Sequence, residues 1–199
     1  MANDIATYLK YANLQMAAES LFGVTNATTV GDISTTMDAG TLTKGNTRSS
    51  KFTVELAKQF TDPTTGWTVV EHKSNTATGF SGTLFKSNAT GELVMSFRST
   101  EFLDDSARDN QATNSMEIKP YGWAFGQIAD MENWYAKLQA DPSKLQGKSF
   151  SVTGYSLGGY LATVCASRTH AAAKDSKRSI CYKNNSCLRN IYKHRSPKA

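Results

Sequence analysis

"VTGYSLGGYLA", residues 152–162, is the stretch that decides the fold of this 199-residue chain. A β-branched run leads into it and small apolar residues follow, which predicts a strand over 149–153, a tight turn at Ser156 and a helix from about residue 157. Gly154 and Gly158, two residues before and two after the serine, leave room for the turn and for close helix–strand packing. A serine in such a nucleophile elbow exposes its hydroxyl, and amides at the helix start face an oxyanion that forms there. The pattern therefore predicts Ser156 as a nucleophile.

Two other interpretations of this stretch compete with the elbow. One is a phosphate-binding loop, but "GYSLGGY" lacks the Gly-Lys-Ser/Thr ending that such loops need. The other is a glycine-rich turn that only packs a helix on a strand, and it stays open. The preceding strand and the small-residue helix favour the elbow.

A second segment, "LVMSFRSTEFLDDSARDN" over 93–110, bears on the same chemistry. A hydrophobic strand ends there in Arg98, Ser99 and Thr100 and continues into an acidic loop. In the elbow architecture, the second oxyanion donor comes from the loop after an earlier strand. Thr100 offers a backbone amide and a hydroxyl for that purpose.

Together, the two segments resemble the fungal-type (class 3) lipases, whose strand ending Phe-Arg-Gly-Thr/Ser precedes a Gly-His-Ser-Leu-Gly-Gly elbow. The chain is most similar to the lipase domain of bacterial secreted lipases and phospholipases of that superfamily. The resemblance covers most of residues 1–173 and is best over 93–164. It implies the N-terminal portion of an α/β-hydrolase fold, a mixed sheet with flanking helices that is incomplete at the C-terminus.

The resemblance also implies particular roles for residues of this chain. Ser156 would be the nucleophile in the hydrolysis of a lipid or other ester, and Leu157 N–H and Thr100 would form the oxyanion hole. No metal or cofactor is needed for that chemistry, and none is expected. Ser99 stands where the family has glycine and Tyr155 where it has histidine, and neither departure removes a reacting group.

The order of elements expected from periodicity favours an α/β sheet with mixed pairing over an all-α or all-β design. Residues 24–50 and 104–120 are rich in polar residues and are expected to form loops, the second a surface excursion. The helix over 4–22, with Asp4 as a candidate cap, is expected to place Ile5, Tyr8, Leu9, Ala12, Met16 and Leu21 near one helical period. The remaining expected elements are a short helix at 51–60, strands at 67–72, 80–86 and 92–97, and a helix at 123–140.

The catalytic acid and base are not at family positions. In these lipases an Asp and then a His follow the serine at long range, but only 43 residues follow Ser156. His72 lies upstream in an expected strand and is interpreted as an ordinary histidine. His170 would lie about 20 Å from Ser156 along a continuous helix. His194, with Asp175 as a nominal acid, is the remaining candidate, but the segment around it shows no clear strand or helix pattern.

The net charge of +5 is unevenly distributed. Residues 174–199 hold eight Lys/Arg and one acid, a net charge of +7, whereas 1–173 hold 14 basic and 16 acidic residues. The division predicts a lipase-like domain over 1–173 and a basic, disordered or non-native tail over 174–199. Cys165 lies in the first part and Cys181 and Cys187 in the second, without metal-ligand spacing, so all three are expected to be free or buried thiols.

Targeting features are sparse. No apolar run is long enough to span a bilayer. The N-terminus lacks the basic and apolar regions of a removable signal peptide, and the family resemblance implies secretion by a route independent of one. Transient contact with a lipid interface is expected, and nucleic-acid binding by the basic tail is not, because the tail lacks an aromatic platform or a known motif.

The sequence is compatible with three functions. The first is a serine ester hydrolase of the lipase type, impaired because its acid and base are missing. The second is a non-catalytic lipid- or partner-binding remnant that keeps the elbow as a structural turn. A nucleic-acid binder is the third and weakest.

The change in charge, in cysteine content and in family resemblance at about residue 174 leads to the hypothesis of a truncated or frame-shifted lipase. If it is right, reading the coding DNA in the other two frames beyond codon 174 will reveal an apolar strand followed by an Asp and a His. The hypothesis fails if neither frame restores them.

Overall fold

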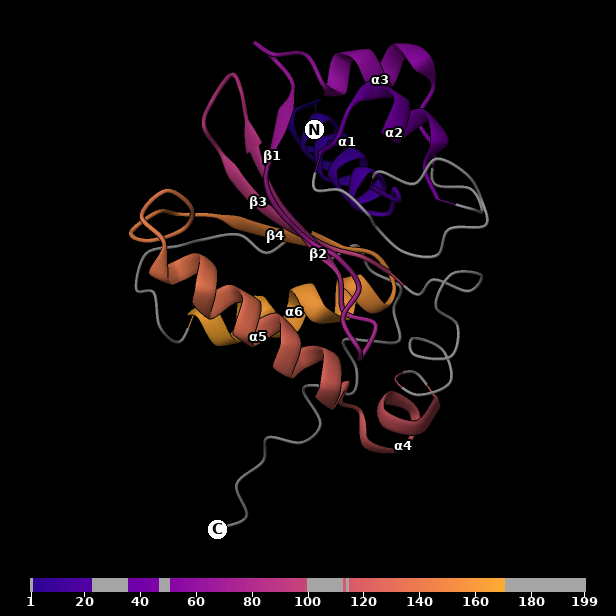
Figure 1. Cartoon of the computed structure of the whole chain (residues 1–199), viewed down its shortest axis with the longest axis vertical. Coiled ribbons are helices and arrows are strands. Elements are labelled where there is room, and N and C mark those ends of the chain that lie inside the picture. The colour runs from indigo at the N-terminus through magenta and orange to yellow at the C-terminus, as the bar shows by residue number, and fades with distance from the viewer. Residues whose placement is uncertain (1, 23–35, 47–50, 100–112, 114, 171–199) are drawn as a thin grey trace.

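The chain forms a four-stranded sheet with helices on both faces (Figure 1). The computed structural model describes residues 2–22, 36–46, 51–99, 113 and 115–170. The predicted boundary at 173/174 and the tail lie outside these residues. The strands stand in spatial order as in the sequence: β1 (Trp67–Lys73), β2 (Gly82–Ser87), β3 (Leu93–Phe97) and β4 (Ser151–Gly154).

Two groups of helices cover the sheet. The N-terminal helices lie on one face and the C-terminal helices on the other, and the short α4 precedes α5 (Figure 1). The N-terminal group is α1 (Ala2–Ala18), α2 (Ala39–Lys44) and α3 (Val54–Phe60), and the C-terminal group is α4 (Lys119–Tyr121), α5 (Phe125–Ala140) and α6 (Leu157–His170).

Strand pairing is mixed. β1, β2 and β3 form an antiparallel meander, and β4 joins β3 in parallel after the crossover through α5. The predicted hairpin between β2 and β3 is present, and Gly91 closes it with a φ of +72° that suits a residue without a Cβ. The expectation of an α/β fold with a mixed sheet and flanking helices is confirmed at this level.

Helices cover both faces of β2 and β3, and successive side chains of a strand point to opposite faces, so these two strands are buried on both sides. Leu84 and Met95 pack with α5 and α6 in one core, and Phe85 and Val94 pack with α1, α2 and α3 in the other. β3 is buried along its whole length. A strand covered on both faces is continuously apolar rather than alternating, which explains the run "LVMSF".

The expected helix over 4–22 is confirmed as α1, but the apolar residues near its predicted period do not form one buried face. Ile5, Tyr8 and Leu9 are 70%, 50% and 60% exposed, whereas Tyr11 and Leu14 are buried against the sheet. Ala17 and Ala18 are also buried and belong to the same core as Tyr11 and Leu14. Of the expected set, Leu21 is buried and Met16 packs against the core, so packing on the sheet covers part of that set and leaves the rest exposed. The expected cap is also misplaced, because α1 begins at Ala2 and Asp4 is already helical.

The segment expected to be loop over 24–50 contains α2. Asp38 caps this helix, accepting a hydrogen bond from Thr41 N at 2.6 Å, and Leu42 buries its side chain in the core. Six residues are too few to show a helical period, so only the cap could have marked it. In the second predicted loop, 104–112 and 114 lie outside the described residues and Thr113 is buried. Residues 115–120 are helical rather than loop, but none of them is buried, as expected of a surface segment.

Helix α5 follows the sequence pattern. The expected face of α5 is buried at Ile128, Met131, Trp134 and Leu138, with Tyr135 packed at its edge. Within the described part of the chain, no helix combines the length and apolar character needed to cross a membrane.

A pair of buried hydroxyls between β3 and β4 gives a test of the packing. Ser96 and Thr153 stand opposite each other, are fully buried, and have no hydrogen-bond partner among the described residues. Thr153→Val keeps the side-chain shape and removes an unsatisfied polar group, so it is expected to raise the free energy of unfolding by about 1 kcal/mol. Urea denaturation measures the change.

Thr83→Val is the matched control. Thr83 is equally buried on the same row of the sheet, but its hydroxyl bonds His72 Nδ1 at 2.8 Å. Its replacement is expected to lower stability by about 1–2 kcal/mol. A loss of stability in Thr153→Val as large as in the control would contradict the assignment of an unsatisfied hydroxyl.

Candidate active site

Ser156 stands at the turn between β4 and α6 in a strained backbone conformation. Its φ is +51°, and no other non-glycine residue in the described part of the chain has a positive φ. For a residue with a Cβ, this left-handed conformation costs about 1–2 kcal/mol. The Ser156 carbonyl accepts the first hydrogen bond of α6, from Tyr160 N at 3.0 Å, and the serine side chain is exposed. The strain is thus located at the residue that the sequence pattern singles out.

Gly154 and Gly158 allow the turn to pack closely against the ends of β4 and β3. A Cβ on Gly154 would lie 2.3 Å from the carbonyl carbon and oxygen of Gly158. A Cβ on Gly158 would lie 2.2 Å from Phe97 O and 2.9 Å from Arg98 O, at the end of β3. Since real Cβ atoms do not approach this closely, both positions require glycine for the start of α6 to contact the strand ends.

The start of α6 directs backbone amides toward the turn. Leu157 is the first residue of the helix, and its side chain is buried in the core. The first amides of a helix have no partner within the helix and carry its positive dipole end. The predicted oxyanion donor Leu157 N–H therefore adjoins Ser156. The other predicted donor, Thr100, lies outside the described residues.

The end of β3 is tied to the end of α1 by buried charged groups that sequence reasoning missed. Arg98 donates from Nε to Ala18 O at 3.0 Å and from Nη2 to Ser20 O at 2.7 Å. Ser99 N donates to Glu19 Oε1 at 2.7 Å. Arg98 is 3% exposed and Glu19 is 6% exposed. A signal was present in the sequence, because Glu19 interrupts an apolar run and Arg98 directly follows one.

The structure does not bring a histidine to Ser156 among the described residues. His72 is buried in β1, where it stacks on Phe22 at 4.0 Å and bonds the Thr83 hydroxyl. In register it lies three strand spacings from Thr153, about 14 Å across the sheet. α6 runs unbroken to His170, whose backbone is therefore about 20 Å from Ser156. His194 and Asp175 lie outside the described residues.

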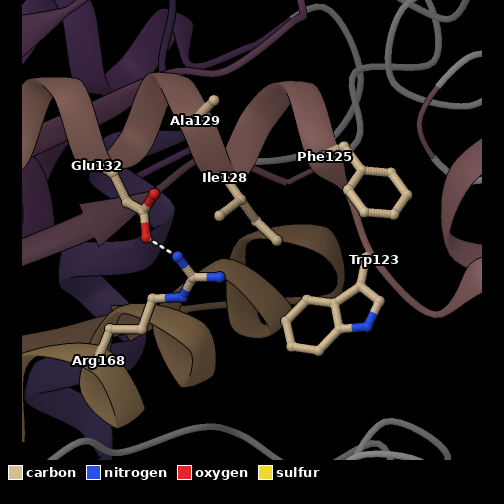
Figure 2. Close-up of a pocket in the computed structure, with 6 residues that line it drawn as sticks. All are labelled: Trp123, Phe125, Ile128, Ala129, Glu132 and Arg168. Atoms are coloured by element: carbon tan, nitrogen blue, oxygen red, sulfur yellow. Dashed lines mark hydrogen bonds and ion pairs between the residues drawn. The ribbon is translucent and has the colours of Figure 1, made fainter. Parts of the chain in front are cut away.

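A groove of about 360 Å³ lies between α5 and α6 (Figure 2). Tyr160, one turn beyond Ser156, bonds Gly122 O at 3.1 Å and so holds the segment before α5 over the start of α6. The groove has aromatic rings at one end, an apolar floor and an ion pair at the other end (Figure 2). Its lining residues are Trp123, Phe125, Ile128, Ala129, Glu132 and Arg168.

Other reactive groups among the described residues do not compete with Ser156. Cys165 is a free thiol buried in α6, and burial, with the nearby Glu132 carboxylate, raises its pKa to about 12. The thiol is therefore protonated and unreactive in the folded state. Across the described ranges, no group of His, Cys, Asp and Glu is arranged to hold a metal ion. Cys181 and Cys187 lie outside those ranges.

Comparison with known proteins gives only distant likenesses, and these are to solved structures. No protein-family model and no curated protein matches the chain. Among solved structures, the chain is similar to a mutant form of MDLA from Penicillium cyclopium, at 18% identity and with a TM-score of 0.42. The match covers 90% of this chain and 62% of that one, so the chain spans less than two thirds of the length of its structural neighbour.

The close contact at Gly158 leads to a test of the turn. Gly158→Ala would force its Cβ into Phe97 O, so we expect the start of α6 to move away from β3 and stability to fall by about 1–3 kcal/mol. Thermal unfolding followed by circular dichroism measures the loss.

Gly91→Ala is the control for general effects of replacing glycine. Its φ is also positive, but a Cβ there would meet no atom within 4 Å, so only the backbone cost of about 1 kcal/mol is expected. Equal losses in the two variants would show that the turn does not depend on the contact at Gly158.

Proposed function

We propose that this chain is a carboxylic ester hydrolase of the lipase type, or the remnant of one, with Ser156 as its nucleophile. The observation that carries the proposal is the positive φ of Ser156 between a buried parallel strand and a helix. Strain of this kind is found where function requires a particular side-chain position, and here it exposes a hydroxyl at a helix N-terminus. The glycine contacts that hold the turn support the same proposal.

The proposed reaction passes through an acyl-enzyme. Ser156 Oγ attacks the ester carbonyl as its proton leaves to a base, and the alcohol departs from the tetrahedral intermediate. Leu157 N–H, with Thr100 as its proposed partner, stabilises the negative oxygen of that intermediate. Water then hydrolyses the acyl-enzyme and restores the serine. The chemistry needs neither metal nor cofactor, and the substrate class is an acyl ester, with lipid esters first.

The strength of catalysis depends on the base. A serine without a positioned histidine retains the contributions of the oxyanion hole and of substrate binding, a small part of full catalysis. His194 is the remaining candidate from the sequence. We therefore propose an impaired hydrolase, with His194 as the residue to test for a base.

A second candidate function is non-catalytic binding of a lipid or partner. The groove between α5 and α6 favours it, because Trp123 and Phe125 are 42% and 57% exposed at its aromatic end. In that case the turn at Ser156 would serve only to pack α6 on the sheet. The two candidates differ in whether the serine hydroxyl reacts.

The decisive measurement is the reaction of the full chain with a fluorophosphonate that labels activated serines. We expect a single labelled residue, Ser156, identified by mass spectrometry of proteolytic peptides, and no labelling in Ser156→Ala. Hydrolysis of a short-chain and a long-chain p-nitrophenyl ester, measured in parallel, should fall to the background rate in the same variant.

Ser167→Ala is the matched control, since Ser167 is an exposed serine within α6, and this variant should label and hydrolyse as the wild type does. A wild-type chain that neither labels nor hydrolyses would favour the binding function. Retained activity in Ser156→Ala would mean that another residue, or a contaminant, performs the reaction. Loss of activity in His194→Ala with retained folding would identify the base.

A further inference from the structure

The buried link between α1 and the end of β3 lies next to the turn that carries Ser156. Ser99 N donates to Glu19, and Arg98 donates to two carbonyls at the end of α1. The last carbonyls of a helix have no partner within it, and a cation there interacts favourably with the helix dipole. Arg98 thus bonds the carbonyl of Ala18, the last residue of α1, and that of Ser20, two residues further on.

The desolvation cost of burying Glu19 and Arg98 indicates that the end of β3 must be held in a defined position. Glu19 and Arg98 are both more than nine-tenths buried, and removing buried charges from water costs several kcal/mol for each ion before any compensation. Apolar side chains often stabilise such an interface equally well. Apolar packing does not fix a direction, whereas these hydrogen bonds hold Arg98 and Ser99, the two residues that directly follow β3, through defined atoms.

The same part of β3 supports the strained turn. Phe97 stands opposite Gly154 in the parallel pair, and the carbonyls of Phe97 and Arg98 are the atoms nearest to a Cβ built on Gly158. The end of β3 is therefore held between α1 on one side and the start of α6 on the other. A shift of Arg98 by a few tenths of an ångström would change the contact that keeps α6 against β3.

From this geometry we infer that Glu19 is a positioning residue: through the Ser99 amide it holds the end of β3 in the place that maintains the Ser156 turn. The inference rests on the proposed function for its catalytic consequence, but its structural part stands on the contacts alone. Arg98, which follows β3, contributes to the same positioning through its hydrogen bonds to the carbonyls of Ala18 and Ser20.

The test compares variants at Glu19 by fluorophosphonate labelling and by hydrogen exchange of a peptide covering 155–161. Glu19→Ala removes the acceptor, so labelling of Ser156 is expected to slow about tenfold or more, corresponding to about 1.4 kcal/mol. Exchange of the 155–161 peptide should speed up, because the bond from Tyr160 N to Ser156 O opens more often. Glu19→Gln keeps an oxygen that accepts from Ser99 N and should stay close to the wild type in both measurements.

Glu71→Ala is the matched control. Glu71 is also a carboxylate that accepts hydrogen bonds, from Trp134 Nε1 at 2.7 Å and from Lys144, but it lies on β1, away from the turn. This variant should lose stability without changing the labelling rate or the exchange of 155–161. If Glu19→Ala does not fold, Glu19→Asp serves in its place, because its shorter side chain retains the charge but withdraws the acceptor from Ser99 N.

The outcomes separate this inference from the proposed function. Faster exchange at 155–161 in the Glu19 variant, absent in the Glu71 variant, supports the positioning role even where no chain is labelled, and absence of labelling then counts against the hydrolase alone. Unchanged exchange in the folded Glu19 variants overturns the inference. Equal effects of Glu19→Ala and Glu71→Ala also overturn it, because they would show only a general loss of stability.

Discussion

The rest of the structure depends on the contact of α6 with the end of β3 without any side chain between them. Gly158 approaches Phe97 O so closely that a Cβ would lie 2.2 Å away, and Gly154 faces Gly158 in the same manner. Because of this close approach, only Tyr155 and Ser156 are needed to connect β4, which ends at Gly154, to α6, which begins at Leu157. The approach also places the residue between the two glycines, Ser156, in a left-handed conformation that few residues adopt. Backbone strain and an exposed hydroxyl therefore have one cause.

Tight packing at the turn requires that the strand end be held from the other side as well. α1 supplies this support through buried polar groups rather than through apolar packing alone, since Glu19 and Arg98 bond the backbone of the opposite element. The N-terminal helix and the candidate nucleophile are far apart in the sequence, and Arg98 and Ser99, which directly follow β3, link them. A site built on strand and helix ends is positioned more accurately than one built on loops.

Much of the local structure follows from the sequence. Repeated apolar positions predicted α5 and the meander, because covered strands and helix faces leave periodic traces. The turn at Ser156 could be predicted for a steric reason, since Gly154 and Gly158 leave room for the close contact of a strand with the following helix. The face of α1 that packs on the sheet could not be predicted, because Tyr11 and Leu14 together are no more apolar than Ile5 and Leu9. Helix α2 was missed because six residues are too short to show a period, although Asp38 caps it.

What the sequence by itself determined is the chemistry available at the turn: a serine between glycines, a strand before it and a helix after it. These are local properties, set by sterics over a few residues. Only the tertiary structure decided which groups surround that serine. It placed His72 in a core against Phe22, kept His170 at the far end of α6, and brought Glu19 from α1 to the Ser99 amide. Contacts between residues some eighty positions apart depend on how the layers pack, and no local pattern encodes that packing.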